Sequence, residues 1–255
     1  MTRHRWSKEE LVLALNLYLK LPFGKLHQRT PEIIQLAALI GRTPSSVAIR
    51  LNNYAAVDEF HQKRGIVGLA GGRGQVEPIW REFLEDREKF LFESEEILAG
   101  LEKTALEKKY PELPSKYDDL QGETQVREIK TRVNQEVFRL MVLANYGNQC
   151  AITGISIPSL LIASHIIPWA KNEKERLNPE NGICLSPLYD SAFDKGYIGI
   201  TPDLSIVLSE TLKDYRKQEF YQQHFKPIEG FRLRQAEKYL PRREFLEWHL
   251  QNVLA

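Results

Sequence analysis

The segment from Ala163 to Gly196 constrains the fold of this chain more than any other stretch. Ser159 to Ile167 is rich in leucine and isoleucine, which is typical of a buried strand, and Gly182 to Leu185 suits a second one. Pro187 to Asp194 suits one short helix, because proline is favoured in the first turn of a helix. The order strand, strand, helix carries three polar side chains, which are His165, Asn181 and Asp190.

Length and composition set the outer limits. The chain has 255 residues, which suffices for one large domain or for two or three small ones. It has no run of about 18 apolar residues and therefore no expected membrane span. Its start, MTRHRWSKEE, lacks the apolar core of a secretory signal. The only cysteines, Cys150 and Cys184, do not form a Cys-x-x-Cys pair, so we expect a cytoplasmic protein with both thiols in its core.

The net charge of +1 conceals an uneven distribution along the chain. Residues 1–82 carry a net charge of +5, residues 83–125 carry −6, and the remainder carries +2. A basic N-terminal region is typical of a protein that binds nucleic acid, although this excess is modest.

The N-terminal region is predicted to be helical. Ser7 is a favourable cap for a first helix, Thr30 and Pro31 begin a second one that ends at Gly41, and Thr43 begins a third. Two short helices separated by a glycine are typical of a helix-turn-helix. The alternative is a helical bundle with a solvated polar face. For the first alternative we expect DNA contacts from Ser45, Ser46, Arg50, Asn52 and Asn53.

A long charged helix is predicted from Val76 to about Lys109, after a glycine-rich connector from Gly65 to Gly74. Apolar residues recur in it every seven positions, which is the spacing of a coiled-coil seam. The first column is Val76, Phe83, Phe90 and Ile97, and the second is Leu84, Leu91 and Leu98. We therefore predict a homodimer. An amphipathic helix that packs on its own domain is the alternative.

These elements divide the chain into three parts. Residues 1–75 are expected to form a helix-turn-helix-like DNA-binding domain, and residues 76–122 a long helix followed by a linker from Pro111 to Gly122. Residues 123–255 are expected to form the C-terminal domain, which opens with a helix from Thr124 to Asn145 and has a glycine suited to its end at Gly147. The fold class is α+β.

Three motifs in the C-terminal domain resemble one known family. They are HIIPW from His165, NPENG from Asn178 and DSAFDKG from Asp190. Their order and spacing between about Val137 and Glu210 resemble the HNH endonucleases, which have the ββα-metal fold. His165 matches the family's first histidine, Asn181 its central asparagine and Asp190 its last motif position. The stretch GRTPSSV from Gly41 also resembles the N-terminal region of restriction enzymes that carry this nuclease domain.

The resemblance implies a metal-dependent DNA endonuclease, most simply a restriction enzyme, that acts on double-stranded DNA with one metal ion. His165 would activate the attacking water and Asn181 would orient His165. Asp190 would hold Mg²⁺ or Mn²⁺, since hard cations prefer oxygen ligands. Ser164 stands where many members have an acidic or histidine ligand, and we expect it to be a weak metal ligand.

Further residues have two interpretations each. Arg176 either clamps a DNA phosphate or is merely solvated. Tyr189 is an alternative to Asp190 as a lining residue. Asp194 is interpreted as a structural carboxylate at the helix end, and a second metal ligand is the alternative. No structural zinc is expected. The alternative functions are a nicking or homing nuclease, and a non-catalytic DNA-binding regulator built on a decayed nuclease domain.

Overall fold

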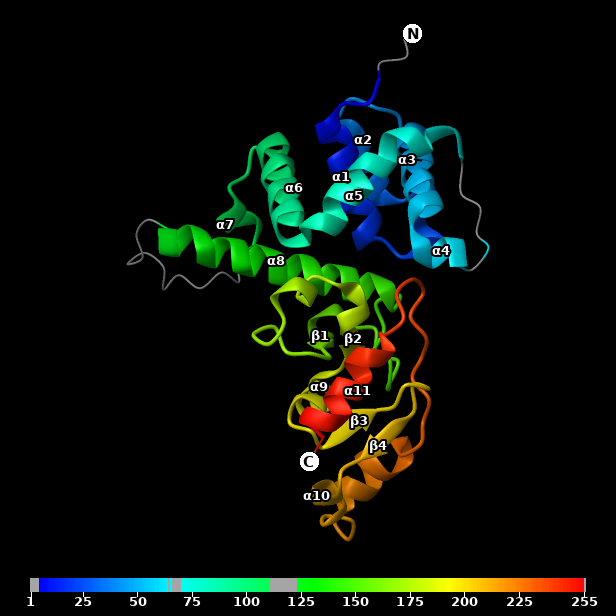
Figure 1. Ribbon diagram of the computed structural model, residues 1–255, viewed down its shortest axis with the longest axis vertical. Coiled ribbons are helices and arrows are strands. Elements are labelled where there is room, and N and C mark those ends of the chain that lie inside the picture. Colours follow the sequence, from blue (N-terminus) through cyan, green and yellow to red (C-terminus); the bar gives the residue numbers. More distant parts are fainter. Residues whose placement is uncertain (1–4, 64, 66–69, 111–122, 255) are drawn as a thin grey trace. The chain divides into compact units, whose positions relative to one another are not determined.

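The computed structural model describes residues 5–63, 65, 70–110 and 123–254 (Figure 1). The chain forms two compact units, Met1–Met141 and Val142–Ala255. The predicted linker at residues 111–122 lies outside the described residues, and so do residues 66–69 of the predicted connector. The rest of that connector is not a plain loop, because Ala70–Gly72 form a 3-10 helix and Arg73 begins an α-helix.

The described part of the first unit is helical. Its helices are α1 (Lys8–Lys20), α2 (Pro31–Leu39), α3 (Pro44–Val57), α4 (Glu59–Lys63), α5 (Arg73–Glu85), α6 (Arg87–Glu102), α7 (Leu106–Lys109) and most of α8 (Glu123–Asn145). The predicted cap of α1 is confirmed, since the Ser7 side chain accepts a hydrogen bond from the Glu10 amide and Glu10 bonds back to Ser7. Thr43 caps α3 through the Ser46 amide.

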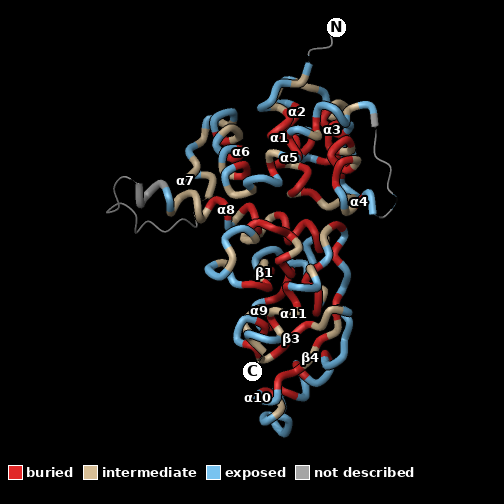
Figure 2. Tube along the Cα trace, in the orientation of Figure 1, coloured by how far each residue is buried: buried red, intermediate tan, exposed pale blue. Residues whose placement is uncertain are grey.

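The core of the first unit lies where α1, α3 and α5 meet (Figure 2). Tyr18 and Tyr54 are fully buried there. Their hydroxyl groups donate hydrogen bonds to Asp58 Oδ2 and to the carbonyl of Leu11, at 2.7 and 2.8 Å. A buried hydroxyl group needs such a partner, so these two bonds fix how α1 and α3 pack.

The prediction of one helix from Val76 to Lys109 is wrong. Helix α5 ends at Glu85, and Asp86 caps α6 by accepting a hydrogen bond from the Lys89 amide at 2.9 Å. Lys103 ends α6 in the left-handed conformation with φ of 52°. Two local signals mark these breaks, a capping aspartate and a polar Lys-Thr pair, and the seven-residue pattern obscured both.

Four members of the predicted dimer seam lie in the core of the first unit instead, namely Val76, Phe83, Phe90 and Leu91. Val76, Phe83 and Phe90 are 0%, 3% and 4% exposed. The rings of Phe83 and Phe90 pack edge to face, with centroids 5.7 Å apart, so the first column joins α5 to α6 within one chain. The seam prediction was wrong because a seven-residue repeat serves helix packing inside a domain equally well.

Replacing Phe83 or Phe90 with glutamate is expected to unfold the first unit. Loss of a buried phenylalanine alone costs about 3–5 kcal/mol, and an unpaired buried carboxylate adds to that loss. Circular dichroism and a thermal melt of the full chain measure the effect. Leu84→Glu is the control, because Leu84 is 42% exposed. A well-folded Phe83→Glu variant that sediments as a monomer beside a dimeric wild type would restore the dimer seam.

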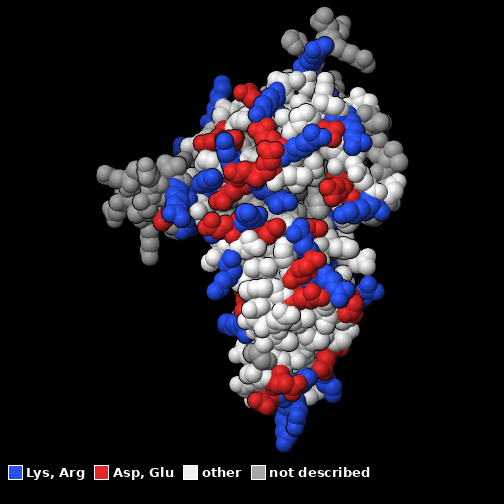
Figure 3. All heavy atoms as spheres, in the orientation of Figure 1, with Lys and Arg blue, Asp and Glu red and all other residues white. Residues whose placement is uncertain are grey.

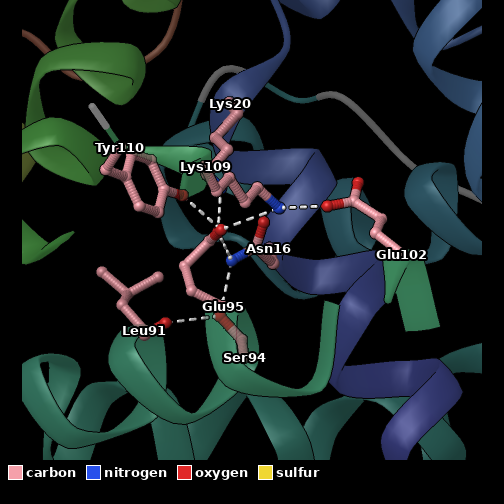
Figure 4. A network of polar contacts seen from close by, with 8 residues as sticks. All are labelled: Asn16, Lys20, Leu91, Ser94, Glu95, Glu102, Lys109 and Tyr110. Atoms are coloured by element: carbon pink, nitrogen blue, oxygen red, sulfur yellow. Dashed lines mark hydrogen bonds and ion pairs between the residues drawn. The ribbon is translucent and has the colours of Figure 1, made fainter. Parts of the chain in front are cut away.

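A buried polar network centred on Glu95 joins α1, α6 and α7 (Figure 4). The carboxylate accepts hydrogen bonds from Lys20 Nζ and the Tyr110 hydroxyl, and one from Asn16 Nδ2 at 2.7 Å. Lys109 Nζ lies 3.4 Å from the same carboxylate. Burial alone would raise the pKa of Glu95, but the two lysine charges and the hydrogen bonds outweigh it and lower the pKa to about 2. Glu95 is therefore an ionised carboxylate in the core.

The two compact units divide within α8, after Met141. The helix is continuous from Glu123 to Asn145, and its first part belongs to the first unit. Asn134 shows why, since its side chain is buried and donates a hydrogen bond to the carbonyl of Glu88 on α6 at 3.1 Å.

Among the described residues, the second unit contains two small antiparallel sheets, three α-helices besides the end of α8, and several short 3-10 or π turns. One sheet pairs β1 (Ile162–His165) with β2 (Gly182–Leu185), and the other pairs β3 (Ile198–Ile200) with β4 (Ile206–Leu208). The helices are α9 (Pro187–Asp194), α10 (Glu210–Lys213) and α11 (Arg243–Asn252). The predicted bounds of β2 and α9 are confirmed, and the predicted strand from Ser159 is shorter. The α+β class is confirmed.

Helix α9 contacts β1 and β3, and the C-terminal helix α11 contacts β3 (Figure 1). Gly199 on β3 permits the close approach of α11, because a Cβ atom at this position would lie 2.6 Å from Leu250 Cδ2. Register pairs Ser164 with Ile183 and His165 with Gly182. The first β-hairpin and α9 thus carry the polar residues that the sequence singled out.

The surface of the first unit is mixed in charge. On the face drawn in Figure 3, lysine and arginine side chains alternate with aspartate and glutamate side chains over its helices. The basic excess of the N-terminal region therefore does not form one continuous basic face on this side. Within the described ranges, no helix combines the length and the apolar character that crossing a membrane requires.

Candidate active site

A cleft of about 380 Å³ lies between β1, α9 and α11 in the second unit. Its polar and aromatic lining residues are Ser164, His165, Trp169, Asp190, Asp194 and His249. The structure therefore brings together three of the residues that the sequence analysis selected, and it adds others from α9 and α11.

His165 ends β1 and lies at the wall of the cleft. Its Nε2 atom is 3.0 Å from the carbonyl oxygen of Arg176, and its ring meets the Trp169 ring edge to face at 5.6 Å. A carbonyl oxygen only accepts hydrogen bonds, so Nε2 carries the proton and the lone pair of the neutral ring is on Nδ1. Burial lowers the pKa of His165, and the bond to Arg176 only partly offsets this, so the neutral ring is favoured near pH 7.

Asn181 lies just before β2 and ties the loop after His165 to the second strand. Its Oδ1 atom accepts a hydrogen bond from the Ile167 amide at 2.8 Å, while Nδ2 donates to the carbonyls of Ile167 and Glu175 at 3.1 and 3.2 Å. The Asn181 carbonyl accepts from the Ile166 amide at 3.0 Å. Asn181 is buried and holds the backbone on either side of the loop.

Two carboxylates of α9 line the cleft. Asp190 and Asp194 are four residues apart, so they lie on one side of the helix. Burial raises the pKa of both groups, and the charge of Asp190 raises the pKa of Asp194 further. Ser164 is 2% exposed and faces them. Its hydroxyl group lowers both pKa values, although it is too poorly aligned for a regular hydrogen bond.

This arrangement fits a divalent cation. Neither Asp190 nor Asp194 has an ion-pair partner among the described residues. No basic side chain there offsets the repulsion between the two carboxylates, and a cation would do so. Carboxylate and hydroxyl oxygens are ligands that Mg²⁺ and Mn²⁺ accept. Within residues 5–63, 65, 70–110 and 123–254, no three histidine, cysteine or acidic side chains converge closely enough to enclose a metal. An ion held here would take the rest of its ligands from water or substrate oxygens.

Arg176 contacts the loop around Trp169 and His165. Its Nε atom donates to the Trp169 carbonyl at 2.7 Å, and its guanidinium group lies 5.3 Å from the centre of the Trp169 ring. Its own carbonyl accepts the hydrogen bond from His165. Arg176 therefore orders the loop that fixes the histidine ring.

The predicted DNA-contacting residues of α3 are only partly at the surface. Arg50 and Asn53 are 9% and 2% exposed, and Arg50 stacks on the Trp6 ring at 4.8 Å. Asn52 donates to the carbonyls of Leu26 and Ala48. These three side chains are directed into the first unit because α3 contacts α1, α2 and α5. Ser45 is exposed and Ser46 half-buried.

Sequence reasoning missed one residue of the cleft, His249. Asp194 also lines the cleft, which agrees with the alternative interpretation of it as a second ligand, and its spacing of four residues from Asp190 indicates a shared helix side. His249 received no role, and its distance in sequence from the motifs left no signal. Tyr189 is not in the cleft, because it is buried and donates to the His224 carbonyl at 2.7 Å. Both cysteines are buried and unoxidised.

Comparison with known proteins gives one family. Residues 150–201 match the model of the HNH endonuclease family, a range that includes β1, β2, α9 and β3. A comparison with curated proteins gives no match to the chain. The match covers the strand–strand–helix segment and its cleft residues His165, Asp190 and Asp194, but neither the first unit nor α11. The second unit therefore contains an HNH endonuclease domain.

Proposed function

We propose that this chain is a metal-dependent DNA endonuclease that hydrolyses phosphodiester bonds with one divalent ion. The observation that supports it best is the bond from His165 Nε2 to the Arg176 carbonyl. This bond selects the tautomer in which Nδ1 is the base, as proton abstraction from a water molecule requires. His165 accepts the proton at Nδ1, and Asn181 keeps the loop in place while it does so.

Asp190, Asp194 and Ser164 would hold the ion, Mg²⁺ or Mn²⁺. A bound ion supplies positive charge for the scissile phosphate and for the leaving 3′ oxygen. Asp194 adds the negative charge that Ser164 cannot, which compensates for the neutral residue before the histidine. The same neutral residue is what favours the second candidate, a DNA-binding regulator with an inactive nuclease domain.

A restriction role on double-stranded DNA is the biological setting we propose for this activity. Its support is the likeness of the N-terminal region to restriction enzymes and the separate helical unit that precedes the nuclease domain. In that setting the exposed start of α3, with Ser45 and Ser46, is the part of the first unit that we propose approaches DNA.

Incubation of the full chain with phage DNA, modified and unmodified, tests the function. With Mg²⁺ or Mn²⁺ we expect cleavage that EDTA stops, and a gel then separates the alternatives. Discrete fragments indicate a restriction enzyme, nicked circles a nicking enzyme, and a smear an unspecific nuclease. Intact DNA with a mobility shift would favour the regulator and contradict the nuclease.

Neutralising either carboxylate of α9 is expected to weaken metal binding. Asp190→Asn and Asp194→Asn each remove a negative charge from the cleft, so we expect the affinity for Mn²⁺ to fall by about 10-fold or more. Titration calorimetry without DNA measures this directly. Asp203→Asn is the control, because Asp203 bonds only to Thr201 and Ser205 in its own turn among the contacts described. An unchanged affinity in Asp194→Asn would return that residue to a structural role.

A further inference from the structure

The C-terminal helix α11 contributes one polar side chain to the cleft, His249. Its ring lies parallel to the ring of Phe193, with an interplanar angle of 1° and centroids 3.7 Å apart. His249 is 2% exposed. Phe193 precedes Asp194 on α9, so His249 is fixed against the helix that carries both carboxylates.

The two ring nitrogens of His249 differ in their surroundings. Nε2 is 3.1 Å from the carbonyl oxygen of Phe193, and since a carbonyl only accepts, Nε2 must carry the proton. Nδ1 then has the lone pair. It is buried and has no hydrogen-bond partner in the part of the chain that the structure describes.

A plain core histidine does not account for this arrangement. A buried acceptor without a partner costs about 1–3 kcal/mol, whereas a phenylalanine at position 249 would stack on Phe193 without that cost. The neutral residues Ser164 and His249 and the carboxylates of α9 line the same cleft. Nδ1 therefore lacks a hydrogen-bond donor, and a ligand bound in the cleft would supply one.

We propose that His249 is an outer ligand of the divalent ion, whose Nδ1 atom accepts a hydrogen bond from a water molecule that the ion holds beside Asp190 and Asp194. Ions of the Mg²⁺ type retain several waters when they bind proteins, and each water is a strong donor. Within the described ranges, no three histidine, cysteine or acidic side chains are grouped so that they could hold a metal ion, so we place the contact of His249 through a water molecule rather than on the ion itself. Outer ligands of this kind orient and tighten a metal site.

This inference rests on the proposed nuclease function and makes α11 part of the active site, although α11 lies outside the matched residues 150–201. The nuclease domain of this chain then requires its C-terminal extension for metal binding. The extension would have only a packing role if His249 were a core residue.

The test measures Mn²⁺ affinity of the full chain without DNA, by electron paramagnetic resonance of the free ion. His249→Ala and His249→Phe are each expected to lower the affinity by about 10-fold or more. His249→Phe keeps a ring against Phe193, and circular dichroism verifies that each variant is folded. Added imidazole fills the space in His249→Ala and should restore affinity. Pyrrole has the same shape and the N–H donor but no basic lone pair, and should not restore it.

Two results would overturn the inference, an unchanged Mn²⁺ affinity in the folded His249→Phe variant and rescue by pyrrole equal to that by imidazole. The second result would show that His249 only packs against α9. Both leave the nuclease function intact if the wild type binds Mn²⁺ and cleaves DNA. A wild type that neither binds Mn²⁺ nor cleaves DNA contradicts the proposed function itself.

Discussion

Replacing His165 with alanine is expected to lower the rate of DNA cleavage by about 10²–10⁴-fold, the usual contribution of a general base. The affinity for DNA should stay within a few-fold of the wild type, because the base acts on the water and not on the bound strand. Single-turnover cleavage on a gel measures the rate, and a mobility-shift titration in Ca²⁺ or EDTA measures the affinity.

His224→Ala is the matched control, since His224 is an exposed histidine of the same unit. Only its backbone carbonyl takes part in a described hydrogen bond, the one from Tyr189, and alanine retains that group. We expect cleavage by this variant at the wild-type rate. If His165→Ala cleaves as fast as His224→Ala, then His165 is not the base, and the cleft must use another group.

The motif segment was predictable from the sequence because its elements are defined by local signals. Pro187 in the first turn of α9 and Gly182 before an apolar run mark the bounds that the structure has. The resemblance of the histidine and aspartate motifs to the HNH endonucleases implied that His165 and Asp190 share one site, and both residues line the cleft.

The first unit was less predictable because its signals are not local. The apolar columns of Phe83 and Phe90 predict a buried helix side but do not tell whether the partner is a second chain or the next helix. Likewise, Arg50 and Asn53 are polar residues that a sequence pattern assigns to the surface, whereas α3 has neighbours on several sides. His249 meets Phe193 across 56 positions of sequence, which no local pattern reveals.

Replacing Glu95 with alanine is expected to destabilise the first unit by about 3–5 kcal/mol. The carboxylate is 0% exposed and compensates the charge of Lys20, which is itself largely buried. Removal of one partner from a buried ion pair leaves the other charge buried without compensation. The resulting loss of stability is much larger than the net stability that the intact pair contributes. Hydrogen exchange of peptides from α1 and α6, followed by mass spectrometry, measures the first unit separately from the second.

The control for Glu95 is a surface pair on the same helix. Glu93 lies 3.8 Å from Lys89, and both side chains are about half exposed or more, at 48% and 65%. We expect Glu93→Ala to change stability by less than about 1 kcal/mol. If both glutamate variants exchange alike, then Glu95 and its network do not hold α6 against α1.

The loss of stability caused by Glu95→Ala should also depend on pH in a defined direction. The folded pKa of Glu95 is about 2, below its ordinary value of 4.5. A carboxylate whose pKa is lower in the folded state than in the unfolded state stabilises the fold at any pH above the ordinary pKa. This contribution disappears as the pH falls toward the pKa of the folded state. The wild type and Glu95→Ala should therefore differ most at neutral pH and approach each other between about pH 4.5 and pH 2. A stability difference that stays constant across this interval would mean that Glu95 acts by its shape and hydrogen bonds rather than by its charge.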